Sequence, residues 1–185
     1  MSVQTTAPAQ AGCDHRHVGV LITRGERVLL AAPPAFSAGY SPLTGHGDGR
    51  TPQEAAAMLC RRAGLGDAVL SPAGGGRCPD TCSRPTGPGE PGHQWVLYRA
   101  RVDQDPAATT TITLGWHTLD QVRSLADITV AYARGVVKEG SWRTSPGLSP
   151  TWVGWLIALG LVGRLPSRDI KAVAALAGSP AGGAR

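Results

Sequence analysis

Apolar side chains gather in short runs that suit β-strands along the first two thirds of the chain. Residues 17–32 read H-V-G-V-L-I-T-R-G-E-R-V-L-L-A-A, which predicts two strands joined by a turn at Arg24-Gly25-Glu26. Residues 93–102 alternate in polarity and are rich in strand-forming types, so they predict a central strand. Shorter strands are expected at residues 68–70 and 109–114.

Helices are predicted where apolar residues recur at helical spacing behind a capping residue. The clearest helix begins after Thr51, which can cap it, while Glu54 three residues later completes a capping box. Gly64 can take the left-handed conformation that ends this helix. Further helices are predicted at residues 127–139, 150–159 and 167–178, and the glycine- and proline-rich stretches 33–50 and 71–92 are expected to be loops.

Three of these segments, taken in order, carry a family resemblance. Residues 43–65 read L-T-G-H-G-D-G-R-T-P-Q-E-A-A-A-M-L-C-R-R-A-G-L, a glycine-rich loop that leads into the capped helix. Together with the hairpin at 17–32 and the segment G-W-H-T-L-D-Q-V at 115–122, this stretch resembles the Nudix hydrolases. The signature of that family is G-x5-E-x7-R-E-U-x-E-E-x-G-U, where U is an aliphatic residue and the glutamates hold magnesium.

The resemblance implies the fold and its extent. It predicts an α/β protein, a Nudix-type α/β/α sandwich with a mixed sheet, over residues 15–125. The tail lies beyond the matched part, and residues 126–178 are expected to form a C-terminal helical extension. The two ends, residues 1–14 and 179–185, are expected to be disordered.

The residues that would hold the metal of this family differ in the present chain. When the signature is aligned on Gly64 and Leu65, its paired glutamates fall on Arg61 and Arg62. Magnesium in such sites needs carboxylates to offset its charge, and two arginines would repel it. No metal cofactor is therefore expected. Magnesium enters only under the alternative of a residual hydrolase with relocated carboxylates, drawn from Asp48, Glu54 or Glu90.

The loop before the capped helix holds the leading candidates for chemistry. A histidine beside a carboxylate can act as a general acid or base, so His46 and Asp48, with Glu54, are the predicted catalytic residues. Arginine side chains can grip a phosphate or carboxylate with paired hydrogen bonds, although cations in the last turn of a helix also favour its dipole. The predicted substrate-binding residues are Arg50, Arg61, Arg62, His17, Tyr98 and Trp116.

The cysteines allow a zinc site as an alternative. Cys78, Cys82 and His93 have the ligand types that zinc prefers, and a fourth ligand would have to come from elsewhere, such as Cys13 or His15. A loop with two reduced thiols explains the same residues, and no metal ligand is predicted.

Composition and charge narrow the partners. The chain has 185 residues, a formal net charge of +5 and a pI near 9.4, which favours an anionic small-molecule partner. It shows no nucleic-acid recognition motif, and its longest apolar helix is too short to span a membrane. Four cysteines without a secretory leader indicate a cytoplasmic protein. A homodimer could form through the helix that bears Trp152 and Trp155.

Three functions remain open from the sequence. The first is a diverged Nudix-fold enzyme, in bacterial specialised metabolism, that uses acid–base chemistry on an anionic or phosphorylated small molecule without the multi-glutamate magnesium site. The second is a residual metal-dependent Nudix diphosphate hydrolase. The third is a non-catalytic module or regulator that binds an anion or nucleotide.

Overall fold

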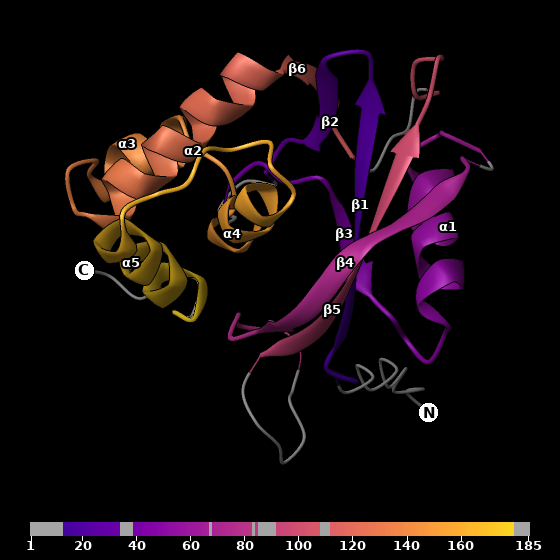
Figure 1. The fold of residues 1–185 in the computed structure, drawn as a ribbon, viewed down its shortest axis with the longest axis horizontal. Helices are drawn as coiled ribbons and strands as arrows, with labels where there is room; N and C mark the ends of the chain where they lie inside the picture. The colour runs from indigo at the N-terminus through magenta and orange to yellow at the C-terminus, as the bar shows by residue number, and fades with distance from the viewer. Residues whose placement is uncertain are drawn as a thin grey trace, which may run out of the picture.

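A computed structural model describes residues 13–33, 39–66, 68–82, 84, 92–107 and 112–179. Within this part the chain forms a mixed sheet flanked by helices (Figure 1). The strands are β1 (Arg16–Arg24), β2 (Arg27–Ala31), β3 (Leu43–His46), β4 (Leu70–Cys78), β5 (His93–Arg101) and β6 (Leu114–Thr118). The helices are α1 (Pro52–Arg62), α2 (Leu119–Ala133), α3 (Glu139–Thr144), α4 (Pro150–Ala158) and α5 (Ser167–Ala177).

Strand β1 is the axis of the sheet, whose main order is β4-β5-β1-β2-β6. Along one edge β1 pairs in parallel with β5. Along the other edge its first half pairs antiparallel with β3, and its end pairs antiparallel with β2. Strands β4 and β6 add antiparallel to β5 and β2, which makes the sheet mixed as predicted.

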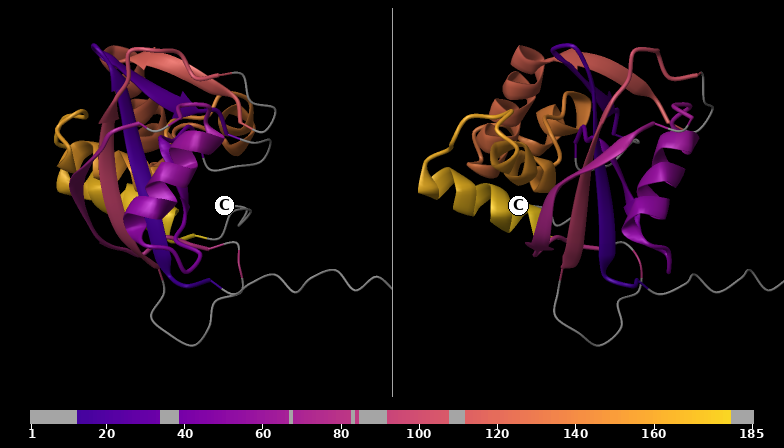
Figure 2. Two further views of the ribbon diagram at one scale, coloured as in Figure 1. Left: turned by 90° about the vertical axis from the view of Figure 1, so that its right-hand side faces the viewer. Right: turned by 45° about the vertical axis from the view of Figure 1, so that its right-hand side comes forward.

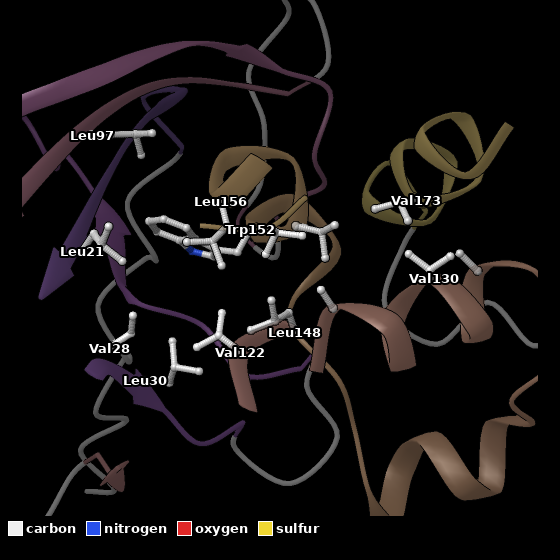
Figure 3. Close-up of a cluster of buried hydrophobic side chains, with 14 of the residues drawn as sticks. Leu21, Val28, Leu30, Leu97, Val122, Val130, Leu148, Trp152, Leu156 and Val173 are labelled. Atoms are coloured by element: carbon white, nitrogen blue, oxygen red, sulfur yellow. The ribbon is translucent and has the colours of Figure 1, made fainter. Parts of the chain in front are cut away.

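Helices cover both faces of this sheet, so the chain is an α/β/α sandwich, as predicted (Figure 2). Helix α1 packs on one face over a core that includes Val20, Ile22 and Cys60. On the other face α2, α4 and α5 enclose a second core with Trp152 near its centre (Figure 3). Burial of such apolar side chains is the main favourable term in folding.

The best-patterned segments form as predicted. The side chain of Thr51 accepts a hydrogen bond from the Glu54 backbone N–H, and the Glu54 side chain accepts one from the Thr51 backbone N–H, which completes the capping box. Gly64 takes a left-handed φ of 71° after α1. The first hairpin and the strand β5 also occupy the predicted segments.

Two segments expected to be loops contain strands. Strand β3 lies within residues 33–50, and β4 occupies most of the first half of 71–92. Gly74, Gly75 and Gly76 in β4 have φ between 136° and 151°, a conformation that residues with a side chain rarely adopt. Strand propensity therefore gave no signal there, and the hydrogen bonds of the neighbouring β5 impose the extended conformation.

The C-terminal helices share a hydrophobic core with the sheet and are not a separate appendage. The boundary expected at residues 125–126 falls inside α2, which runs from Leu119 to Ala133, whereas the sequence predicts a helix at residues 127–139. Trp152 is buried within the chain, so α4 packs on the sheet domain, and dimerisation through this helix stays a prediction. Among the residues that the structure describes, no helix has both the length and the hydrophobicity needed to cross a membrane.

Candidate functional site

The strand register brings polar side chains from four segments to one end of the sheet. Because β1 and β5 are parallel, both start there, and because β3 and β4 run antiparallel to them, both end there. His17 on β1 pairs with His46 on β3, and Cys78 on β4 pairs with His93 on β5. This is the lower end of the sheet in Figure 1.

Two thiols and two imidazoles meet at this end and are called the thiol–imidazole cluster below. The Sγ atom of Cys13 lies 3.3 Å from Nε2 of His93, and Nε2 of His46 lies 3.2 Å from Sγ of Cys82. One ligand atom from each of the four side chains lies within 4.8 Å of the others. Cys13 and His93 are buried, whereas His46 and Cys82 are partly exposed.

Asp80 holds the cluster in place from the loop that follows β4. Its Oδ1 atom accepts hydrogen bonds from the His93 backbone N–H, at 3.1 Å, and lies 2.8 Å from His93 Nδ1. Its Oδ2 atom accepts a hydrogen bond from Trp95 Nε1 at 3.1 Å. Burial alone would raise the pKa of Asp80, but hydrogen bonds with His17 and His93 hold it well below its usual range. Asp80 is therefore a buried carboxylate with its charge retained.

The surroundings set the charge of the other cluster members. Burial, followed by the positive potential of His17 and Arg84, lowers the pKa of His46 to about 4, so its imidazole is neutral at pH 7. Burial also lowers the pKa of His17, whose ring stacks on His93 with centroids 4.0 Å apart. Burial opposes ionisation of Cys82, yet the Arg84 backbone N–H, Cys13 and His93 together lower the pKa of its thiol.

Of the predicted catalytic residues, only His46 lies in this cluster. Asp48, which has a left-handed φ of 51°, accepts an ion-paired hydrogen bond from Arg84. Among the described residues no hydrogen bond joins His46 and Asp48, so the structure does not bring them together as an acid–base pair. Glu54 accepts from the Thr51 backbone N–H at 2.9 Å and from its hydroxyl at 2.7 Å, which commits it to the helix cap.

The predicted substrate-binding residues are spread over the molecule. Arg50 precedes α1, and Arg61 and Arg62 lie in its last turn. An 11-residue helix is about 16 Å long, so the backbone of Arg50 lies roughly that far from the last turn that carries Arg61 and Arg62. Tyr98 is buried in the core beneath α1. The Trp116 indole donates to Asp105, and the Arg24 guanidinium lies 4.6 Å above its ring. Of the predicted binding residues, His17 is the one whose ring contacts that of His46.

Helix α1 does not fit the magnesium that the Nudix resemblance implies. In the described part of the chain, two groups of side chains could hold a metal ion: the thiol–imidazole cluster, and His17 with Asp80 and His93. Neither group includes a residue of α1. The carboxylate of α1, on Glu54, is already used as a cap, and a dication there would face Arg61 and Arg62.

Sequence reasoning missed part of this site. The sequence places Cys82, His93 and Cys13 among candidate zinc ligands together with Cys78, and nothing in it marks His46 or Asp80 as part of the same site. Cys13 and His93 are 80 residues apart in sequence, and Cys82 and His46 are 36 apart, so no short ligand spacing marks them. Cys78 instead packs against the core under α4, where burial raises the pKa of its thiol to about 11.

Comparisons with known proteins bear on the fold. No protein-family model and no curated protein matches the sequence. DR0079 from Deinococcus radiodurans matches with a TM-score of 0.51 at 13% identity, over 85% of this chain and 90% of that one. A MutT protein from Methanosarcina mazei Go1 matches with a TM-score of 0.51 at 13% identity, over 78% and 91%. A Nudix hydrolase from M. smegmatis, RenU, matches with a TM-score of 0.41 at 20% identity, over 61% and 76%.

The two matches with a TM-score of 0.51 agree with the structure itself. A mixed sheet with β1 at its centre, the loop and capped helix at residues 43–65, and the α/β/α layering all follow the resemblance seen in the sequence. At such identities a structural match establishes the fold and leaves activity to the chemistry of the site. The chain therefore has the fold of the Nudix superfamily.

Proposed function

We propose that this Nudix-fold chain binds an anionic or phosphorylated small molecule and does not cleave it through glutamate-held magnesium. The observation that carries the proposal is the state of α1. Its one carboxylate, Glu54, closes the capping box, and its last turn carries Arg61 and Arg62. A catalytic magnesium needs several oxygen ligands beside the substrate phosphates, and this helix offers too few.

The loop before α1 is the best-supported place for the anion. Arg16, Arg50 and Arg84 border residues 47–50: the Arg16 carbonyl accepts from the Gly47 N–H, and Arg84 pairs with Asp48. Asp14 also lies here and accepts from the Gly49 N–H. With the buried Asp80 included, three arginines and three aspartates lie at this end of the sheet, so guanidinium hydrogen bonds rather than net charge would recognise the anion. Arginine forks suit phosphate and carboxylate oxygens, which supports an anionic ligand.

A ligand panel tests this proposal directly. Binding of pyrophosphate, ADP and a nucleotide sugar is measured by calorimetry, and release of phosphate or nucleoside monophosphate is followed with and without magnesium. We expect binding without magnesium-dependent turnover, and about 10-fold weaker binding in Arg50→Ala, which corresponds to about 1.4 kcal/mol. Arg27→Ala is the matched control, because Arg27 is an exposed arginine at the opposite end of β1.

One result would contradict the proposal, and another would extend it from binding to catalysis. Magnesium-dependent release that Glu54→Gln abolishes would identify a residual diphosphate hydrolase. Metal-independent conversion that His46→Ala abolishes would identify a diverged enzyme that uses acid–base chemistry.

A further inference from the structure

We propose that the thiol–imidazole cluster, formed by Cys13, His46, Cys82 and His93, binds one zinc ion. This site is separate from the α1 position at which the Nudix signature holds magnesium, and it goes beyond the proposed anion binding. Its ligands come from the segment before β1, the end of β3, the loop after β4 and the start of β5.

The spacing of the four ligand atoms suits a tetrahedral zinc. With Zn–S near 2.3 Å and Zn–N near 2.0 Å, ligand atoms around one ion lie roughly 3.3–3.8 Å apart. The two S···N separations of 3.2 and 3.3 Å lie just below and at the lower limit of this range, and no pair exceeds 4.8 Å. The side chains thus need only small rotations to close around an ion.

Charge and protonation also suit zinc. Two thiolates balance the charge of the dication, so the occupied site is neutral overall and tolerates burial. Imidazole binds metals in its neutral form through one ring nitrogen, and Nε2 of both His46 and His93 lies against a cluster sulfur. The His15 and Arg84 backbone N–H groups each donate to a cluster sulfur at 3.3 Å, on Cys13 and Cys82 respectively, which stabilises sulfur as thiolate.

The partner of His93 supplies the most specific sign of a metal site. Asp80 lies 2.8 Å from Nδ1 of His93, while Nε2 is the atom that faces Cys13. A carboxylate that accepts from Nδ1 fixes the tautomer that leaves Nε2 free as a ligand, the arrangement common to metal-binding histidines. Trp95 and the His93 backbone hold the carboxylate in turn.

The ligand set points to a structural role. Four protein ligands complete the coordination of zinc, whereas catalytic zinc sites keep one position for water or substrate. Two thiolates with two imidazoles in a tetrahedral arrangement favour zinc over magnesium or calcium. The ion would tie the segment before β1 and the loop after β4 to the end of the sheet.

The metal content of the full-length, tag-free chain tests the proposal. We expect about one zinc per chain by elemental analysis, and X-ray absorption that shows two sulfur and two nitrogen ligands at about 2.3 and 2.0 Å. Replacement by cobalt(II) should produce the intense thiolate-to-cobalt absorption of a tetrahedral site. These measurements on the unaltered chain hold even where a ligand variant fails to fold.

Substitutions assign the ligands. Cys82→Ser and His93→Ala should lose the zinc, whereas Cys78→Ala, in the same segment but outside the cluster, should keep it. Asp80→Asn should weaken zinc binding about 10- to 100-fold while keeping the cobalt spectrum, as expected of a positioning residue. His17→Ala should keep the metal. Loss of the metal in His17→Ala would instead assign the ion to the group formed by His17, Asp80 and His93.

Two outcomes would overturn the proposal. One is a chain that folds fully after chelation and binds cobalt(II) without thiolate absorption. The other is full zinc content in the double variant Cys13→Ser/Cys82→Ser. Neither outcome bears on the anion panel, so the two proposals fail separately.

Discussion

Asp80 shows how much one residue can organise in this protein. Its carboxylate is buried and accepts hydrogen bonds from the His93 backbone and the Trp95 indole, while His93 Nδ1 lies against it. Nothing in the sequence marks Asp80, because its partners lie 13 and 15 residues away, across the loop that links β4 to β5. Its importance follows from burial together with the number of donors that it satisfies.

Removing this carboxylate should be costly. Asp80→Ala leaves the His93 N–H and the Trp95 Nε1–H buried without an acceptor, so we expect a loss of about 3–5 kcal/mol in the free energy of unfolding. Urea denaturation followed by tryptophan fluorescence measures it. Asp14→Ala is the control, because Asp14 is an exposed aspartate at the same end of the sheet. A loss below about 1 kcal/mol for Asp80→Ala would show that water replaces the carboxylate.

At the scale of elements, the sequence predicted a helix or turn correctly where all the residues that form it are close together in the chain. The capping box of α1 needs only Thr51 and Glu54, and the turn of the first hairpin needs only Gly25, which has a φ of 55°. Strands β3 and β4 escaped prediction because pairing with β1 and β5 creates them. Partners distant in sequence decide such strands, and strand propensity depends strongly on that context.

The cap of α1 makes a testable case at this scale. Thr51→Ala removes the hydroxyl that accepts from the Glu54 N–H at 3.3 Å, and we expect it to lower the free energy of unfolding by about 1 kcal/mol. Ser149 caps α4 without a side-chain hydrogen bond, so Ser149→Ala should cost less. Thermal unfolding of both variants measures the difference, and equal losses would contradict the capping argument.

At the scale of the whole molecule, the C-terminal helices complete the core of the sheet domain. The Trp152 ring lies over Gly19 of β1, and its Nε1 donates to the Thr44 hydroxyl of β3 at 2.8 Å. Helix α4 therefore covers the face of the sheet opposite α1, as Figure 3 shows for Trp152 among Leu21 and Leu156. Fold and extension form one packed unit.

A pair of glycine substitutions tests this integration. A methyl group at Gly19 would lie 2.7 Å from the Trp152 ring and 2.8 Å from Leu97, so Gly19→Ala should destabilise the chain by about 1–3 kcal/mol. Gly154 lies in α4 itself, with no atom near its would-be Cβ, so Gly154→Ala should stabilise by up to about 1 kcal/mol. Chemical denaturation measures the free energy of unfolding of both variants. An unchanged value for Gly19→Ala would mean that Trp152 of α4 does not pack closely on β1.

The sequence by itself determined the features whose causes lie within a few residues of each other. These are the capped helix, the hairpin, the strand β5 and, through their order, the Nudix fold. It also determined that α1 lacks the carboxylates of a magnesium site. Only the tertiary structure decided which polar residues meet: it placed His46 with Cys82 and Cys13 with His93, packed Cys78 against the core and paired Asp48 with Arg84. The physical reason is that strand register, set by hydrogen bonds between distant segments, fixes which side chains share an end of the sheet.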